Sequence, residues 1–177
     1  MNDTYTGAIS LSIFGESHGP AVGATLSGLA AGVPVDEAYI AREMDKRRAA
    51  GKLSTRRTEP DKVHFLSGVY RGFTTDTAVT LVIENTNTRS EDYAKTQDLL
   101  RPGHADWTAH LKYRGFQDAR GGGHFSGRLT APLVAACAIL KQMLEKRGVV
   151  IGTHLAQCAG VEDEPLAPGG EALARQL

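Results

Sequence analysis

The chain has 177 residues, of which 41% are hydrophobic and 23% charged, enough for one substantial core or two small ones. Its 20 basic and 20 acidic residues balance, so the net charge favours neither nucleic acid nor an anionic membrane as a partner. No apolar run approaches membrane-spanning length, and the segment MNDTYTGAISLS lacks the features of a signal peptide, which predicts a cytoplasmic protein. Cys137 and Cys158 lie in apolar contexts without C-x-x-C spacing, and we expect both to be reduced core residues.

Apolar residues alternate with small or polar ones in the first part of the chain, as is typical of strands. Residues 7–14 and 21–27 have this period of two. The glycines and proline between them predict a turn, with His18 at a strand end. Further strands are expected at about 62–69 and 77–84, the second rich in β-branched residues.

Two helices are predicted. Asp36 is a suitable N-cap for a helix that ends near Arg48. Three of its apolar side chains are spaced for one buried face: Tyr39, Ile40 and Met44. Residues 130–147 have the strongest helical pattern, with a proline in the first turn and a glycine after the last. The middle of this second helix is apolar on most sides, so we expect it to be buried on more than one face.

The remaining segments complete an α+β pattern. The polar, aperiodic residues 85–97 predict a mobile loop, and residues 149–156 predict a strand. Residues 171–177 open a helical pattern that stops without a cap, so we expect further chain in a complete domain. Strands with few intervening helices favour α+β over alternating βαβ units.

A glycine-rich segment, RGGGHFSGR, lies directly before the second predicted helix. Backbone N–H groups of residues 121–123 can converge on an anion, and the helix N-terminus adds partial positive charge. The flanking Arg120 and Arg128 can complete a phosphate cradle, together with Ser126. A bare triple glycine is more often a flexible loop, but the attached arginines and helix favour an anion site.

A basic cluster follows the first predicted helix: Lys46, Arg47, Arg48, Lys52, Arg56 and Arg57. Such clusters are usually solvated faces that interact favourably with the helix dipole. The functional interpretation is a second phosphate or carboxylate contact, because guanidinium groups bind both in a bidentate manner.

Two of the six histidines, His18 and His104, lie on glycine-containing turns with charged neighbours. Imidazole can transfer protons near neutral pH, although a single histidine of this kind is more often structural. No histidine and carboxylate spacing indicates a metal site, and nucleophile-elbow, Walker and Rossmann patterns are absent from the sequence. The residues themselves thus predict a phosphate-handling site with two acid–base candidates and leave the substrate open.

Six segments in order resemble chorismate synthase across nearly the entire chain: FGESHG, the arginine cluster before EPDKV, LSGVYRG, IENTNTRSEDY, RPGHAD and RGGGHFSGR. The resemblance implies an anti-1,4-elimination of phosphate from 5-enolpyruvylshikimate 3-phosphate to give chorismate, a step of aromatic amino acid biosynthesis. Reduced FMN is required and not consumed overall, and NADPH is a candidate reductant. By the same resemblance, His18 protonates the departing phosphate and His104 protonates the reduced flavin near N1.

The resemblance also implies binding residues. Arg47 matches an arginine that contacts phosphate groups, and Lys52 stands near the family's second binding arginine. We expect further phosphate contacts from Arg101, Arg120 and Arg128. The expected flavin contacts follow the glycines: Gly122, Gly123, His124, Phe125 and Ser126. His-Phe-Ser replaces the more familiar Arg-Ser-Ser here, and one extra residue follows Lys112 and Tyr113, which we interpret as a subgroup signature.

Chorismate synthases form a β-α-β sandwich with helices between antiparallel sheets, assemble as homotetramers and are markedly longer than this chain. The resemblance therefore implies that the C-terminal part is absent, and that these 177 residues alone are inactive. Two other classes of protein compete with this interpretation. One is a flavin- or phosphometabolite-binding module without catalysis. The other, a basic RNA-binding protein, is disfavoured by the balanced charge and the few aromatic residues.

Overall fold

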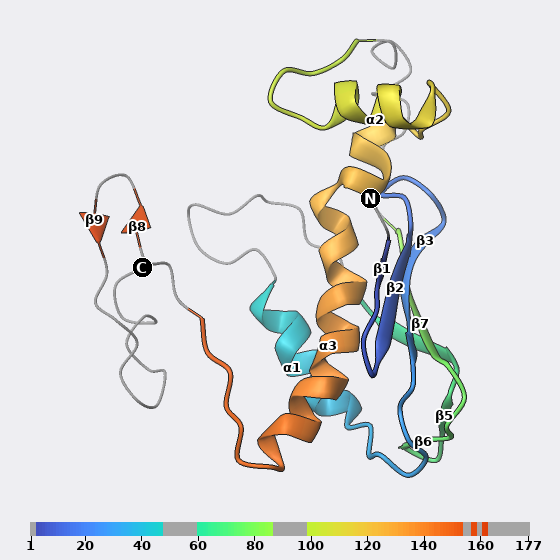
Figure 1. Cartoon of the computed structure of the whole chain (residues 1–177), viewed down its shortest axis with the longest axis vertical. Coiled ribbons are helices and arrows are strands. Elements are labelled where there is room, and N and C mark those ends of the chain that lie inside the picture. Colours follow the sequence, from blue (N-terminus) through green and yellow to red (C-terminus); the bar gives the residue numbers. More distant parts are fainter. Residues whose placement is uncertain (1–2, 48–59, 87–98, 154–156, 159–160, 163–177) are drawn as a thin grey trace. The chain divides into compact units, whose positions relative to one another are not determined.

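The computed structural model describes residues 3–47, 60–86, 99–153, 157–158 and 161–162. Contacts divide the chain into two units, Met1–Leu140 and Lys141–Leu177. The first unit holds the sheet, the candidate site and the helices that pack on the sheet, except for the C-terminal end of the last helix (Figure 1). The predicted loop at 85–97 beyond residue 86, the pattern at 171–177 and Lys52 lie outside the described residues.

The first unit is built on a five-stranded antiparallel sheet in the order β1-β2-β3-β7-β4. The strands are β1 Thr4–Tyr5, β2 Ser10–Gly15, β3 Ala21–Ser27, β4 Val63–Ser67 and β7 Val79–Glu84. The four strands predicted from periodicity are confirmed, and β3 has the predicted bounds. A small hairpin joins β5 Val69–Tyr70 to β6 Phe73–Thr74.

One face of the sheet forms the core. Ala24 pairs with Ile13 on one side and with Leu81 on the other, so apolar side chains line up across three strands. Six residues of β3 and β7 on this face are almost completely buried: Val22, Ala24, Leu26, Val79, Leu81 and Ile83. The opposite face is less buried and includes polar residues such as Thr25 and Thr80, whose hydroxyls lie 3.2 Å apart. This alternation is the reason that the strands were recognisable in the sequence.

Helix α1, Glu37–Lys46, packs on the core face and confirms the first predicted helix. The Asp36 side chain accepts hydrogen bonds from the backbone N–H groups of Ala38 and Tyr39, at 2.9 and 3.1 Å, as an N-cap does. Ile40 and Met44 are buried as predicted, whereas Tyr39 is only half-buried. The helix ends at Arg47, whose position matters for the site described below.

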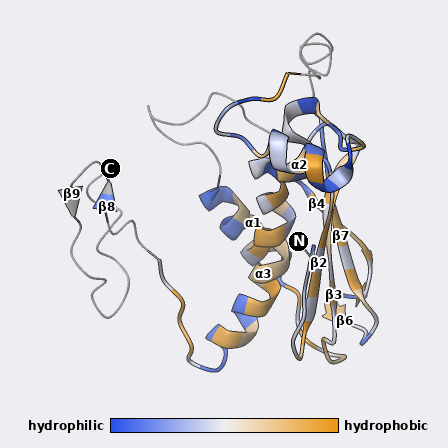
Figure 2. Cartoon of the chain, turned by 45° about the horizontal axis from the view of Figure 1, so that its top comes forward, coloured by the Kyte–Doolittle hydropathy of each residue, from blue (hydrophilic) through white to orange (hydrophobic). Residues whose placement is uncertain are grey.

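Helix α3, Thr130–Glu145, confirms the second predicted helix and lies on the same side of the sheet as α1 in both views (Figures 1 and 2). Its buried side is made mainly of alanines, which let the backbone approach the sheet closely: Ala131, Ala135, Ala136 and Ala138. Cys137 is free, as expected, but the expectation of a core position is wrong because the residue is exposed. It belongs to the side of α3 opposite the alanine contacts.

Three local predictions need correction or addition. Helix α2, Asp106–Tyr113, was not predicted, because its residues have only weak helical periodicity. The strand predicted at 149–156 is wrong for the described residues 149–153, which have no regular structure. In the second unit, β8 Gln157–Cys158 pairs instead with β9 Val161–Glu162. Among the described residues no helix is long and apolar enough to cross a membrane.

Candidate active site

The turn after β2 places His18 beside the glycine-rich segment. His18 is buried, and its Nδ1 lies 3.2 Å from the hydroxyl of Ser17. That hydroxyl lies 3.4 Å from the carbonyl of Arg120, and the Ser17 backbone N–H donates to the carbonyl of Gly123 at 3.1 Å. If the single Ser17 proton is donated to Arg120, the hydroxyl accepts from the His18 Nδ1–H, which fixes the tautomer of the imidazole.

The glycine-rich segment, η2 Arg120–Phe125, is a turn that is kinked at its three glycines, where the backbone is not helical. All three glycines have positive φ, at 58°, 101° and 53° for Gly121, Gly122 and Gly123, a conformation that side chains disfavour. A Cβ on Gly121 would overlap the His18 ring, and one on Gly122 would lie 2.9 Å from Cε1 and Nε2 of His104. The absence of side chains on two adjacent glycines therefore leaves room for the rings of His18 and His104, the two histidines identified from the sequence.

His104 belongs to a compact charged group at the start of α2. Its Nδ1 lies 2.6 Å from Oδ1 of Asp106. Arg101 clamps the same carboxylate, with Nε 2.7 Å from Oδ2 and Nη2 2.8 Å from Oδ1. These hydrogen bonds from Arg101 hold the pKa of Asp106 far below its usual range, against the opposing effect of desolvation. The carboxylate is thus anionic at any pH near neutrality.

The predicted contacts around the glycines have defined partners. Arg120 pairs with Asp118 through Nε and Nη2, at 2.9 and 2.7 Å, which lowers the pKa of Asp118. The Nδ1 of His124 lies 2.8 Å from the carbonyl of Gly15. Ser126 accepts a hydrogen bond from the backbone N–H of Arg128 at 3.3 Å and so starts the short turn η3, Gly127–Leu129. Phe125 contacts the ring of Tyr113, with centroids 6.0 Å apart.

Arg47 and Arg128 converge on one buried carboxylate, that of Asp61. Arg47 Nη1 lies 2.5 Å from Asp61 Oδ2, and Arg128 Nη1 contacts Asp61 Oδ1. The side chain of Asp61 is only 4% exposed, so two guanidinium groups surround a charge that water hardly reaches. Sequence reasoning found both arginines but missed Asp61, which lies 14 and 67 residues from them.

Asn85 joins this ionic group to the His18 turn. Its Nδ2 donates to the carbonyls of Glu16 and Gly19, at 3.0 and 2.8 Å, and its Oδ1 accepts from Arg128 Nε at 2.9 Å. Every polar atom of the Asn85 amide is engaged at the end of β7. The turn that carries His18 is therefore held from one side by the glycine segment and from the other by Asn85.

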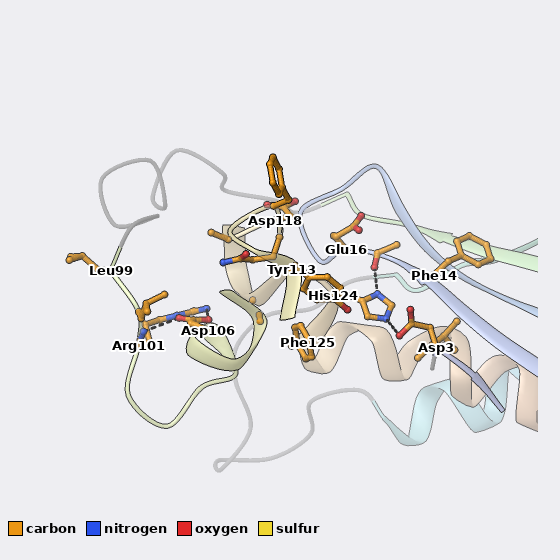
Figure 3. A pocket seen from close by; sticks show the side chains of 18 of the residues that line it. Asp3, Phe14, Glu16, Leu99, Arg101, Asp106, Tyr113, Asp118, His124 and Phe125 are labelled. Atoms are coloured by element: carbon orange, nitrogen blue, oxygen red, sulfur yellow. Dashed lines mark hydrogen bonds and ion pairs between the residues drawn. The ribbon is translucent and has the colours of Figure 1, made fainter. Parts of the chain in front are cut away.

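A cavity of about 670 Å³ opens beside the glycine segment, large enough for a cofactor-sized ligand (Figure 3). The Arg101–Asp106 pair lies on one side of it, and His124 with Asp3 on the other. Aromatic side chains contribute to its wall: Phe14, Tyr113, Phe116 and Phe125. Gln117 also lines the cavity, and its buried Oε1 has no hydrogen-bond partner among the described residues.

The described residues contain no group of three or more histidine, cysteine or acidic side chains that could hold a metal ion. The fold and the site thus define an α+β protein with a histidine- and arginine-bordered cavity at a glycine turn. The family model for chorismate synthase matches residues 9–175, nearly the full chain. The chain belongs to the chorismate synthase family.

Curated relatives agree with this assignment. The chain is 49% identical to the chorismate synthase of Aeropyrum pernix over 86% of its length, and 47% identical to that of Sulfurovum sp. over 90%. A crystal structure of a chorismate synthase matches 79% of the chain with a TM-score of 0.56 and 30% identity. The chain spans 40% and 45% of the two curated relatives and 35% of the chain in the crystal structure.

Proposed function

We propose that this chain supplies part of the active site of a chorismate synthase, a lyase that eliminates phosphate from 5-enolpyruvylshikimate 3-phosphate with the help of reduced FMN. The observation that supports this best is the seating of His18 and His104 on the adjacent glycines 121 and 122. The family membership is the reason for proposing this reaction, and the geometry supports His18 and His104 as its two proton donors.

The two histidines suit different roles in this reaction. His18 is buried and belongs to a hydrogen-bonded series that runs through Ser17 to the backbone of the glycine segment. In the proposed reaction it protonates the departing phosphate, which offsets the negative charge that develops as the C–O bond breaks. His104, which is more accessible and lies against the neighbouring Gly122, protonates the flavin near N1 in this proposal.

The residues around the cavity fit a flavin. The volume suffices, aromatic side chains form part of the wall, and the unpartnered Oε1 of Gln117 can accept a hydrogen bond from a ligand. We expect contacts from Gly122, His124 and Phe125, which line this cavity, and from their sequence neighbours Gly123 and Ser126. When bound, reduced FMN would supply an electron transiently, and the residues around the cavity would hold it.

The proposed phosphate contacts fall into two sets. Arg47 and Arg128 both contact the carboxylate of Asp61. A phosphate bound there would therefore lie beside arginines that already have an anionic partner. Arg101 and Arg120 each pair with a nearby aspartate and are partly exposed, at 41% and 45% of the side chain. All four stay predictions as phosphate ligands, as does Lys52. A homotetramer, NADPH as reductant and a cytoplasmic location stay predictions as well.

A chimeric protein tests the proposal. It joins this chain to the C-terminal part of the Aeropyrum pernix relative that the match does not cover, and the intact relative is the control. Under anaerobic conditions we expect phosphate release from 5-enolpyruvylshikimate 3-phosphate only when FMN is present and reduced. Equal release with oxidised FMN, or without FMN, would contradict the proposal. FMN binding without phosphate release would favour the binding-module alternative.

We further propose that the 177 residues alone release no phosphate and bind FMN more weakly than the chimera. The flavin ring must be enclosed, and the relatives contain more than half of their length beyond the matched region. Calorimetric titration of FMN into both proteins measures the difference. Comparable affinity would show that these residues form a self-sufficient flavin site.

A further inference from the structure

The carboxylate of Asp106 holds a position that determines how the His104 ring can carry its protons. Arg101 donates to it from Nε, Nη2 and its backbone N–H, the last at 2.9 Å. Asp106 is also the first residue of α2, where the helix dipole favours an anion. The carboxylate is therefore a hydrogen-bond acceptor only, and its fourth contact is the His104 Nδ1 at 2.6 Å.

An anionic acceptor at this distance requires that Nδ1 of His104 carries a hydrogen. Arg101 Nη2 lies 3.4 Å from the same Nδ1, but both nitrogens are then donors, so this contact is not a hydrogen bond. The ring nitrogen that remains for proton exchange is Nε2, which lies on the side of Gly122. Without Asp106, the remaining contact of Nδ1, with Arg101, would not favour a hydrogen on that nitrogen.

Two other charged groups near the glycine turn have partners other than His104. In η2, which packs against the His104 ring, Arg120 is paired with Asp118, and His124 lies between the Gly15 carbonyl and Asp3. Within α2, His110 stacks on Trp107, with ring centroids 6.4 Å apart. The charged side chains that contact the His104 ring are those of Asp106 and Arg101.

We propose that Asp106 is a positioning residue that keeps the proton of neutral His104 on Nδ1 and turns Nε2 toward the glycine turn. Arg101 acts one step further out, by holding the carboxylate in place. The relevance to catalysis rests on the proposed function, but the tautomer itself does not. It can be measured in the free chain, without flavin or substrate.

Ring-nitrogen NMR on the ¹⁵N-histidine-labelled 177-residue chain tests the proposal at a pH where His104 is neutral. We expect the Nδ1–H tautomer to exceed the Nε2–H tautomer by roughly tenfold or more, because a hydrogen bond to a charged acceptor is strong. In Asp106→Ala the preference is lost. Asp106→Asn, which keeps the size of the side chain and one acceptor oxygen, should lie between the two and gives the same test if the alanine variant does not fold.

Two controls separate positioning from a general structural effect. Arg101→Gln keeps the contact between Asp106 and His104, so the Nδ1–H tautomer should persist. Asp118→Asn breaks a comparable acid–arginine pair that does not touch His104, and it should leave the ring unchanged. An Nε2–H tautomer in the unaltered chain, or the unaltered tautomer in folded Asp106→Ala, would overturn the proposal.

An activity measurement then relates the tautomer to the reaction. In the chimera, Asp106→Asn should slow phosphate release, by no more than the roughly 10²–10⁴-fold expected for loss of a general acid itself. The NMR result and the activity result can fail separately. Suppose that NMR shows the expected dependence of the His104 tautomer on Asp106, but Asp106→Asn leaves phosphate release by the chimera unchanged. This result would contradict the role of His104 in the proposed reaction and leave the positioning role of Asp106 intact.

Discussion

The backbone of Gly121 lies so close to the imidazole of His18 that a side chain at this position would overlap the ring. The next residue, Gly122, stands in the same relation to His104, with a closest approach of 2.9 Å for a Cβ. The glycines thus provide more than freedom of backbone rotation. They leave the space that two imidazole rings occupy on one short turn.

Gly121→Ala should therefore lower the free energy of unfolding by about 1–3 kcal/mol, because the new methyl group meets His18 and the backbone φ of 58° strains an alanine. Gly127→Ala is the matched control: its Cβ would meet nothing within 4 Å. We expect an effect within about 0.5 kcal/mol there. Urea denaturation of the three proteins measures both values, and equal stabilities would argue against the packing described.

Asp61→Asn tests the buried ionic cluster. The substitution keeps the shape of the side chain but removes the charge that faces Arg47 and Arg128, so we expect a loss of about 3 kcal/mol in the free energy of unfolding. Asp76→Asn is a close control, because Asp76 also has a positive φ, 68° against 43° for Asp61, and is exposed. Its effect should stay within about 0.5 kcal/mol. A similar loss in both variants would mean that the cluster contributes little.

The ion pair between Asp118 and Arg120 predicts a pH dependence of stability. Hydrogen bonds from Arg120 lower the pKa of Asp118 in the folded chain. The resulting stabilisation is complete above the ordinary carboxyl pKa of about 3.9 and is lost as the pH falls through the folded-state pKa. We expect the unaltered chain to be about 1 kcal/mol more stable than Asp118→Asn at pH 7, since the pair is partly exposed. The difference should shrink below pH 4, and a constant difference would contradict this origin.

Local patterns in the sequence were sufficient for most of the fold. The alternation of residues 21–27 predicted β3, and the N-cap chemistry of Asp36 predicted the start of α1, because both depend on neighbouring residues. Helix α2 was missed because its hydrophobic periodicity is weak and its N-cap, Ala105, has no capping side chain. The exposed position of Cys137 could not be predicted, since a helix that is apolar on most sides does not reveal which side meets the sheet.

The candidate site shows the same division. The histidines and arginines were recognisable by residue type and motif, but their partners come from distant parts of the chain. Asn85 and Arg128 are 43 residues apart, and no local sequence pattern in either segment predicts their contact. Asp106 lies only two residues from His104, so its role could have been inferred from the PGHAD motif, where a carboxylate follows an imidazole at close spacing.

The central claim is that the glycine turn brings together two histidines that act as proton donors in one reaction. The most direct test compares anaerobic phosphate release by the chimera with reduced FMN in three variants: His18→Ala, His104→Ala and His110→Ala. We predict that the first two slow release by roughly 10²–10⁴-fold while the fold stays intact. His110, which is exposed and stacks on Trp107, should have almost no effect. Unaltered release by a folded His18→Ala or His104→Ala variant would contradict the claim.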